Sequence, residues 1–213
     1  MPRSNKYPPW SDFRECAVIV AHPDDETLWA GGTMLLLHPE ARWTVLTICR
    51  KSDAERSGRF FRVLEEYGAA GVMGDLDDGP EQNPLDLSDV QETIIRLLPS
   101  VEFDLIITHN TGGEYTRHRR HEETSQAVLA LCGGGRLSAG QLWTFAYEDG
   151  QKKYLPRPIK DADIFIEMPE SVWRKKYKII TELYGFAEDS FEARTTPRCE
   201  AFWRIGQTVG GPH

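Results

Sequence analysis

The sequence predicts an α/β fold, a single Rossmann-like domain in which a mostly parallel sheet carries helices on both faces. Three observations lead to this prediction. Apolar runs of strand length alternate with stretches of helical periodicity, no internal repeat interrupts the alternation, and no linker divides the chain convincingly. A chain of 213 residues, 40% of them hydrophobic, can also bury the core of one large domain.

The expected strands and helices follow one another in regular order. Short apolar or β-branched runs predict strands at residues 16–21, 43–48, 71–74, 104–109, 142–147 and 163–167. Helical periodicity predicts helices near residues 27–37, 53–67, 88–99, 118–132 and 170–185. The stretch 152–160, with two prolines, is predicted to cross the surface as a loop. Strands that alternate with helices favour parallel pairing with crossover helices.

We expect a domain over residues 16–207, an N-terminal extension over 1–15 and a loose tail over 208–213. The start of the chain lacks the apolar core of a secretion signal, and no apolar run reaches the length of a membrane span. The 25 basic and 33 acidic residues give a net charge of −8, which disfavours a nucleic-acid partner. The sequence therefore predicts a cytoplasmic protein. Its four widely spaced cysteines are expected to be reduced packing residues: Cys16, Cys49, Cys132 and Cys199.

One expected strand ends in a concentrated set of polar side chains. The apolar run 17–21 stops at His22 and Pro23, which are followed by three carboxylates. Ligands of open α/β sheets bind just outside the carboxyl ends of strands, so this cluster lies where an active site is expected. His22 and Asp25 are three residues apart and can converge on one cation, with Asp24 in reach of a water held there. A plain helix start would explain the acids but not the histidine.

A second cluster follows the expected strand 104–109. His118 and His121 lie three residues apart where a helix begins, so one imidazole can bind metal while the other remains free to act. The simpler interpretation is a solvated charge network, because the same turn carries Arg117, Arg119 and Arg120. The alternative is that these three arginines line an anionic part of a substrate. The carboxyl ends of parallel strands share one edge of the sheet, so we expect the two clusters to meet. Two imidazoles and one carboxylate leave an open position, as catalytic zinc sites do.

Together the two motifs closely resemble those of the PIG-L or LmbE-like family of zinc-dependent N-acetylglucosaminyl de-N-acetylases. The likeness rests on H-P-D-D-E at residues 22–26 and on the later H-x-x-H, and it spans most of the chain. It implies that three residues bind zinc: His22, Asp25 and His121. It also implies that Asp24 is the general base and that His118, if protonated, donates a hydrogen bond to the oxyanion.

The resemblance extends to substrate contacts. It implies a substrate-binding arginine at Arg56, and residues 200–202 weakly match the closing E-x-F element of the family. The alternative, which the residues alone make the less favoured one, is that Arg56 is a surface arginine paired with Asp53 or Glu55. Tyr115 is a candidate for substrate contact or for loop packing.

The chain departs from the family pattern in two places. Residues 118–121 are H-R-R-H where the family often has H-P-D-H, and Arg59 stands where an acid is common. Both changes fall around substrate contacts. The resemblance implies removal of an acetyl group from a small N-acetylated sugar or glycoconjugate. The candidates are N-acetylglucosamine lipids, thiol-bearing glucosaminides, nucleotide sugars, chitooligosaccharides and acylated natural products, and the sequence also leaves a homo-oligomer open.

Other protein classes share parts of this pattern. Receiver domains bind magnesium with an acidic pair after a first strand, but residues 108–110 contain no counterpart of their phosphoacceptor aspartate. Non-haem iron enzymes use the same two-histidine, one-carboxylate ligand set, so Fe²⁺ is an alternative to Zn²⁺. The alternating pattern disfavours the all-β jelly roll expected for that chemistry. No G-x-G-x-x-G or Walker motif follows an expected strand, which disfavours a nucleotide-binding module.

Overall fold

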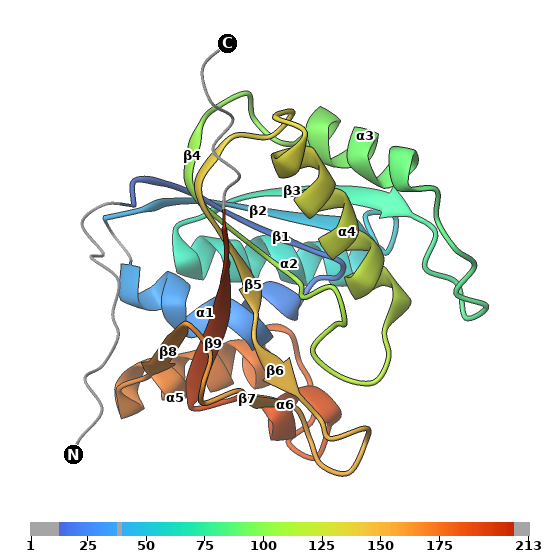
Figure 1. Ribbon diagram of the computed structural model, residues 1–213. Coiled ribbons are helices and arrows are strands. Elements are labelled where there is room, and N and C mark those ends of the chain that lie inside the picture. Colours follow the sequence, from blue (N-terminus) through green and yellow to red (C-terminus); the bar gives the residue numbers. More distant parts are fainter. Residues whose placement is uncertain (1–12, 38–39, 207–213) are drawn as a thin grey trace.

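The computed structural model describes residues 13–37 and 40–206. Its main sheet consists, in spatial order, of β3 (Ala70–Leu76), β2 (Arg42–Cys49), β1 (Glu15–Val20), β4 (Phe103–Thr108), β5 (Ala139–Phe145), β9 (Cys199–Ile205) and β8 (Ile164–Glu167) (Figure 1). The first five pair in parallel, whereas β9 runs antiparallel to both of its neighbours. The predicted α/β fold with a mostly parallel sheet is therefore confirmed.

Helices cover both faces of this sheet (Figure 1). One face carries α1 (Asp25–Leu37), α2 (Ala54–Tyr67), α5 (Glu170–Lys178) and the π-helical turn η2 (Ile179–Leu183). The other carries α3 (Leu87–Leu97) and α4 (Arg119–Gly133). Successive residues of β1 alternate between the two faces, so Val18 and Val20 join the first buried cluster while Ala17 and Ile19 join the second. Burial on both faces explains why β1 is a continuous apolar run.

Three strands were not predicted from the sequence. The stretch 152–160, expected to be a surface loop, contains β7 (Arg157–Pro158), which pairs with β6 (Tyr147–Glu148). The single strand expected at 142–147 is therefore divided between β5 and β6. The third is β9, where three consecutive residues are buried and the alternation that marks a half-buried strand is missing.

The helix expected over 170–185 is present as α5 followed by η2, and a short helix, α6 (Phe191–Thr195), comes after it. No helix in the described part of the chain is long and apolar enough to cross a membrane. The expected C-terminal tail, and the expected N-terminal extension through residue 12, lie outside the described residues. All four cysteines are free thiols, and Cys16 and Cys49 are buried.

A buried carboxylate fastens β9 to the middle of α1. Glu200 is 0% exposed and accepts hydrogen bonds from the backbone N–H groups of Gly32 at 2.7 Å and Thr33 at 2.8 Å. The ammonium of Lys176, also 0% exposed, donates to the same carboxylate at 2.6 Å. Because α1 begins at Asp25, these contacts hold the helix that carries part of the first polar motif.

We expect Glu200→Ala to lower the free energy of unfolding by about 3–5 kcal/mol, because the buried Lys176 ammonium loses its carboxylate partner. Urea denaturation measures the loss. Glu170→Ala is the matched control. Glu170 pairs with Arg174 and Arg198, but its side chain is 49% exposed. The control should therefore cost at most about 1 kcal/mol, and equal losses in the two variants would contradict the interpretation.

Candidate active site

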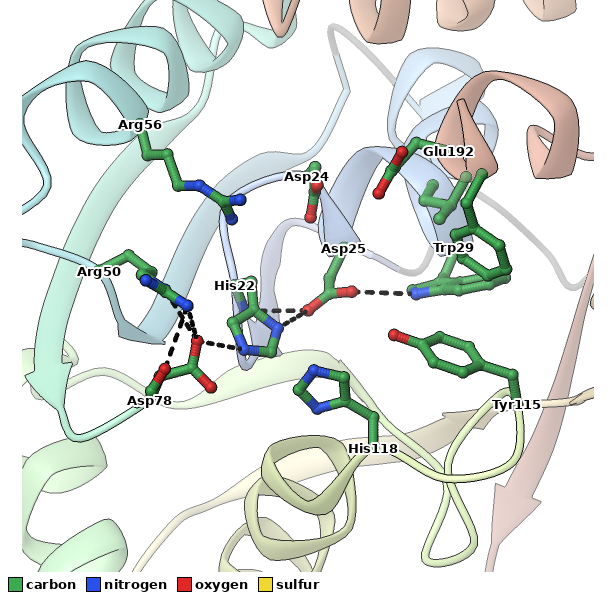
Figure 2. A pocket seen from close by; sticks show the side chains of 12 residues that line it. His22, Asp24, Asp25, Trp29, Arg50, Arg56, Asp78, Tyr115, His118 and Glu192 are labelled. Carbon is green, nitrogen blue, oxygen red and sulfur yellow. Dashed lines mark hydrogen bonds and ion pairs between the residues drawn. The ribbon is translucent and has the colours of Figure 1, made fainter. Parts of the chain in front are cut away.

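The two polar clusters predicted from the sequence meet where the strand order reverses. From β1 the chain continues to β2 on one side, while β4 lies on the other side of β1. In open α/β sheets the ligand crevice forms at this switch point, outside the carboxyl ends of the strands. A cavity of about 210 Å³ opens there. Its lining (Figure 2) consists of His22, Asp24, Asp25, Leu28, Trp29, Arg50, Arg56, Asp78, Tyr115, His118, Phe191 and Glu192.

The first motif forms a tight turn between β1 and α1. Asp24 has φ of 109°, a left-handed conformation that is unfavourable for a residue with a side chain. Glu26, which is 0% exposed, holds this turn because its carboxylate accepts the backbone N–H of Asp24 at 3.0 Å. Figure 2 shows the Asp25 carboxylate facing His22, with Asp24 on the side of Arg56. The turn therefore separates two neighbouring carboxylates.

The Asp25 carboxylate contacts both of the predicted histidine ligands. Asp25 Oδ2 lies 3.1 Å from His22 Nδ1 and 3.3 Å from His121 Nε2. Donor atoms about 2 Å from a tetrahedral zinc ion are about 3.3 Å apart, so these separations fit such an ion. The Trp29 indole N–H donates to the other oxygen of Asp25, Oδ1, at 3.2 Å and so orients the carboxylate.

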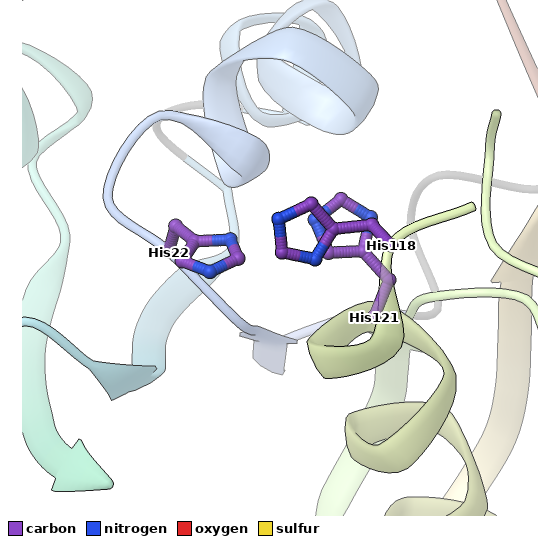
Figure 3. A group of neighbouring side chains, drawn as sticks. All are labelled: His22, His118 and His121. Carbon is purple, nitrogen blue, oxygen red and sulfur yellow. The ribbon is translucent and has the colours of Figure 1, made fainter. Parts of the chain in front are cut away.

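Three buried ring nitrogens have no partner with hydrogen-bond geometry within the described part of the chain: His22 Nε2, His118 Nδ1 and His121 Nε2. A carboxylate oxygen lies 3.3 Å from two of them, Asp78 from His22 Nε2 and Asp25 from His121 Nε2. Figure 3 shows the His22 ring opposite the stacked rings of His118 and His121, and these three residues form one of the groups in which a metal ion could be held. Buried polar atoms without a partner are rare in native proteins, and a bound cation is one explanation for them. The residues present therefore fit a metal ion.

Two other groups of side chains are close enough to hold a metal ion. In the first, His109 joins Asp25 and His121, but the backbone N–H of Ala21 donates to His109 Nε2 at 3.0 Å and occupies that nitrogen. The second consists of His22, Cys49 and Asp78. Arg50 already pairs with Asp78, and burial raises the pKa of the Cys49 thiol. Neither group therefore displaces the ligand set predicted from the sequence, and that set stays a prediction: His22, Asp25 and His121.

The two carboxylates of the turn are in different electrostatic environments. Burial and the neighbouring charge of Asp25 raise the pKa of Asp24 well above its ordinary value. Burial would also raise the pKa of Asp25, but His121 and His109 lower it well below the ordinary value. Two titratable groups whose pKa values are pushed apart are suited to different roles, one in proton transfer and the other as a permanent anion.

His118 lines the cavity as the residue just before α4. Its ring stacks on that of His121 with centroids 4.4 Å apart and meets His22 edge-on at 4.6 Å. Burial, together with these two rings, lowers the pKa of His118 to about 3. This favours a neutral imidazole that donates through an N–H, in place of the protonated ring considered in the sequence analysis.

Sequence reasoning gave no individual role to two carboxylates that lie beside the predicted histidine ligands, Asp78 and Glu114. The carboxylate of Asp78 lies 3.3 Å from His22 Nε2 and accepts from Arg50 Nε at 2.8 Å. Behind His121 stands Glu114, which is hydrogen-bonded to it and to His109. Arg50 and His109 directly follow β2 and β4, so the rule that places sites at strand ends could have found them.

The remaining predicted contacts occupy different environments. Arg56, on α2, lines the cavity with a side chain that is 45% exposed, and its guanidinium is 3.8 Å from Asp53. Tyr115 also lines the cavity, where its ring packs against Phe191 with centroids 5.2 Å apart. These positions are compatible with both interpretations of Arg56, as a substrate contact or as a surface arginine paired with Asp53, and with both interpretations of Tyr115, as a substrate contact or as a packing residue.

Arg120 corrects the interpretation of the arginine-rich turn as solvated. Its side chain is 0% exposed and donates to the backbone carbonyls of Asp77 and Asn83 and to the Glu123 carboxylate. Arg120 is therefore neither solvated nor part of the cavity. It ties α4 to the loop that carries Asp78.

Fold and site define a Rossmann-like α/β protein with a histidine and carboxylate cluster at the switch point of its sheet. The profile of the PIG-L family, described as GlcNAc-PI de-N-acetylase, matches residues 17–132, more than half of the sequence. The chain therefore belongs to the PIG-L family, and the resemblance inferred from its two motifs is confirmed.

Similar proteins cover most of the chain. Uncharacterized protein L374 of Acanthamoeba polyphaga mimivirus is 22% identical over 179 residues, which span 76% of this chain and 75% of L374. A deacetylase of teicoplanin biosynthesis matches with a TM-score of 0.65 at 13% identity, over 92% of this chain and all of that one. GalB, the 4-carboxy-2-hydroxymuconate hydratase of Pseudomonas putida KT2440, matches with a TM-score of 0.64 at 17% identity, over 94% of this chain and 99% of that one. At such identities the likeness to the two solved structures establishes a shared fold.

Proposed function

We propose that this protein is a zinc-dependent hydrolase that removes the acetyl group from an N-acetylated amino sugar. Membership in a de-N-acetylase family supports the class of reaction. The observation that carries the proposal is the position of the Asp25 carboxylate, 3.1 Å from His22 and 3.3 Å from His121, beside a cavity. Fe²⁺ is the alternative metal, because it takes the same ligand set.

His22, Asp25 and His121 would hold the zinc ion, which would act as a Lewis acid toward the acetyl carbonyl and would lower the pKa of a bound water molecule to about 7. Asp24 takes the proton from the attacking water and later delivers it to the nitrogen of the departing amine, which is general base and then general acid catalysis. Burial and the charge of Asp25 raise the pKa of Asp24 well above its ordinary value, which helps the carboxyl group hold the proton until it is delivered to the amine. His118 donates a hydrogen bond to the oxyanion of the tetrahedral intermediate.

The partner we propose is a small N-acetylated sugar or glycoconjugate, bound by Arg56 with a weaker contribution from Tyr115. Arg56 presents a fork of donors that matches paired hydroxyl groups or phosphate oxygens. A cavity of about 210 Å³ suits one sugar unit better than a polymer chain. The cytoplasmic location and the homo-oligomer considered above stay predictions.

A direct assay tests this function. Metal-free protein is reloaded with Zn²⁺ or, anaerobically, with Fe²⁺ and incubated with a panel of N-acetylated amino sugars, and the primary amine that forms is quantified. We expect release from at least one sugar, loss of activity with a chelator and recovery on adding metal. No amine release from any sugar by protein shown to contain metal would refute the proposed reaction.

We expect Arg56→Ala to lower kcat/KM on the true substrate without changing the zinc content. Hydrogen bonds to charged groups contribute about 1.5–3 kcal/mol, so kcat/KM should fall about 10- to 100-fold. Arg56→Lys should recover only part of the loss, because an ammonium cannot reproduce a bidentate contact.

The matched control is Arg62→Ala, which removes an exposed arginine from the same helix. Arg62 is not among the residues that line the cavity, and its guanidinium donates to the Gly58 carbonyl. Its removal should leave kcat/KM and zinc content near those of the unchanged protein. An unchanged kcat/KM in Arg56→Ala would remove Arg56 from recognition.

A further inference from the structure

The buried carboxylate of Glu114 contacts two histidines, the proposed metal ligand His121 and its neighbour His109. Glu114 lies in the loop between β4 and α4, and its side chain is 0% exposed. Its Oε2 atom contacts His121 Nδ1 at 2.7 Å and His109 Nδ1 at 2.9 Å, and its Oε1 atom accepts the backbone N–H of Asn110 at 3.0 Å. An ionised carboxylate can only accept hydrogen bonds, so both imidazoles must carry a proton on Nδ1.

These contacts fix the tautomers of both rings. His109 Nε2 accepts the backbone N–H of Ala21 at 3.0 Å, which agrees with a proton on its Nδ1. His121, with its proton on Nδ1 toward Glu114, keeps a free lone pair on Nε2, the atom that lies 3.3 Å from Asp25. The two rings stack with centroids 3.9 Å apart, and both are buried.

We propose that Glu114 and His109 are positioning residues of the metal centre. Glu114 sets the tautomer and orientation of His121. His109 holds Glu114 in place and, through Ala21, connects it to the strand end that leads directly into His22. This inference rests on the proposed function, because it takes His121 and His22 as metal ligands. Neither positioning residue lines the 210 Å³ cavity that Asp24 and Arg56 line, so neither is assigned a contact with substrate.

Glu114→Gln tests the first part of the inference. Glutamine has nearly the same shape, but one end of its amide is a donor, and it cannot accept all three N–H groups that surround Glu114. Loss of a partner behind a metal-bound histidine typically weakens metal binding about 10- to 100-fold, and we expect a loss in this range. Zinc affinity is measured by competition with a chelator, and Co²⁺ absorption spectra report the geometry of the bound metal.

A pair of variants at His109 tests the second part. In His109→Asn the amide nitrogen can take the place of Nδ1 and still donate to Glu114, whereas His109→Phe keeps an aromatic ring for stacking but has no donor. Zinc affinity should fall further in His109→Phe than in His109→Asn. Equally large losses in both variants would overturn this role and would favour His109 as a ligand.

Thr108→Val is the matched control for general loosening of the core. Thr108 is 0% exposed, immediately precedes His109, and donates to the Ile19 carbonyl of β1 at 2.8 Å. This control should leave zinc affinity and the Co²⁺ spectrum unchanged even if it lowers stability. If Glu114→Gln binds zinc as tightly as the unchanged protein, the positioning role is wrong. If the unchanged protein binds no zinc, the proposed function itself fails.

Discussion

Asp24→Asn is expected to lower kcat by about a hundredfold or more, the range for removal of a general acid–base group. Asparagine has nearly the same shape as aspartate but cannot take a proton from water. Asp24 is not one of the three proposed metal ligands, so the zinc content should not change. Steady-state kinetics on the true substrate, together with elemental analysis of the same sample, separates the two effects.

Glu192→Gln is the control for this prediction, since it removes a negative charge from the same cavity wall. It should lower kcat far less than Asp24→Asn, because Glu192 has no assigned part in proton transfer. Full activity of Asp24→Asn with zinc bound would exclude Asp24 as the base. A similar loss in both variants would indicate that the charge of the cavity matters, with no specific proton acceptor.

The two polar motifs could be predicted to be neighbours because each of them is recognised from a local pattern. The apolar run of β1 ends directly before His22, and the helical pattern of α4 begins directly after His118. In both cases the strand-end rule needs only the sequence on either side of one boundary. The parallel order of the strands then brings the two ends together.

The supporting residues depend on contacts that no local pattern encodes. Glu114 reads as an ordinary loop glutamate, yet the fold buries it between two imidazoles. Asp78 lies 28 residues after Arg50, and only the pairing of β2 with β3 brings them together. Arg120 occupies a turn full of charges, and its complete burial follows from how the loop at 77–83 folds over α4.

The antiparallel strand β9 also depends on contacts that no local sequence pattern encodes. Residues 200–202, near the start of β9, weakly match the E-x-F element of the family, which drew attention to Glu200 but not to a strand. Glu200 can be buried because its carboxylate accepts hydrogen bonds from Gly32 of α1, 168 residues away in the chain, and from Lys176, 24 residues away. A charged residue in an apolar run argues against a buried strand unless its partners are known.

The second large effect is expected from the histidine pair of α4, whose members should respond differently. His121→Ala should lose zinc affinity by more than about 100-fold, the upper end of what loss of a residue behind a ligand costs. His118→Ala should keep zinc and lower kcat by about 100- to 1,000-fold, as removal of one oxyanion donor does.

Zinc titration and kinetics on both variants separate a ligand from a donor, although the two rings are stacked with centroids only 4.4 Å apart. Because Glu114 contacts His121 and not His118, the hydrogen-bond pattern favours His121 as the ligand. Zinc loss in His118→Ala with retention in His121→Ala would reverse the two roles. The metal would then bind to His22, Asp25 and His118, and Glu114 would support a ring that does not touch it.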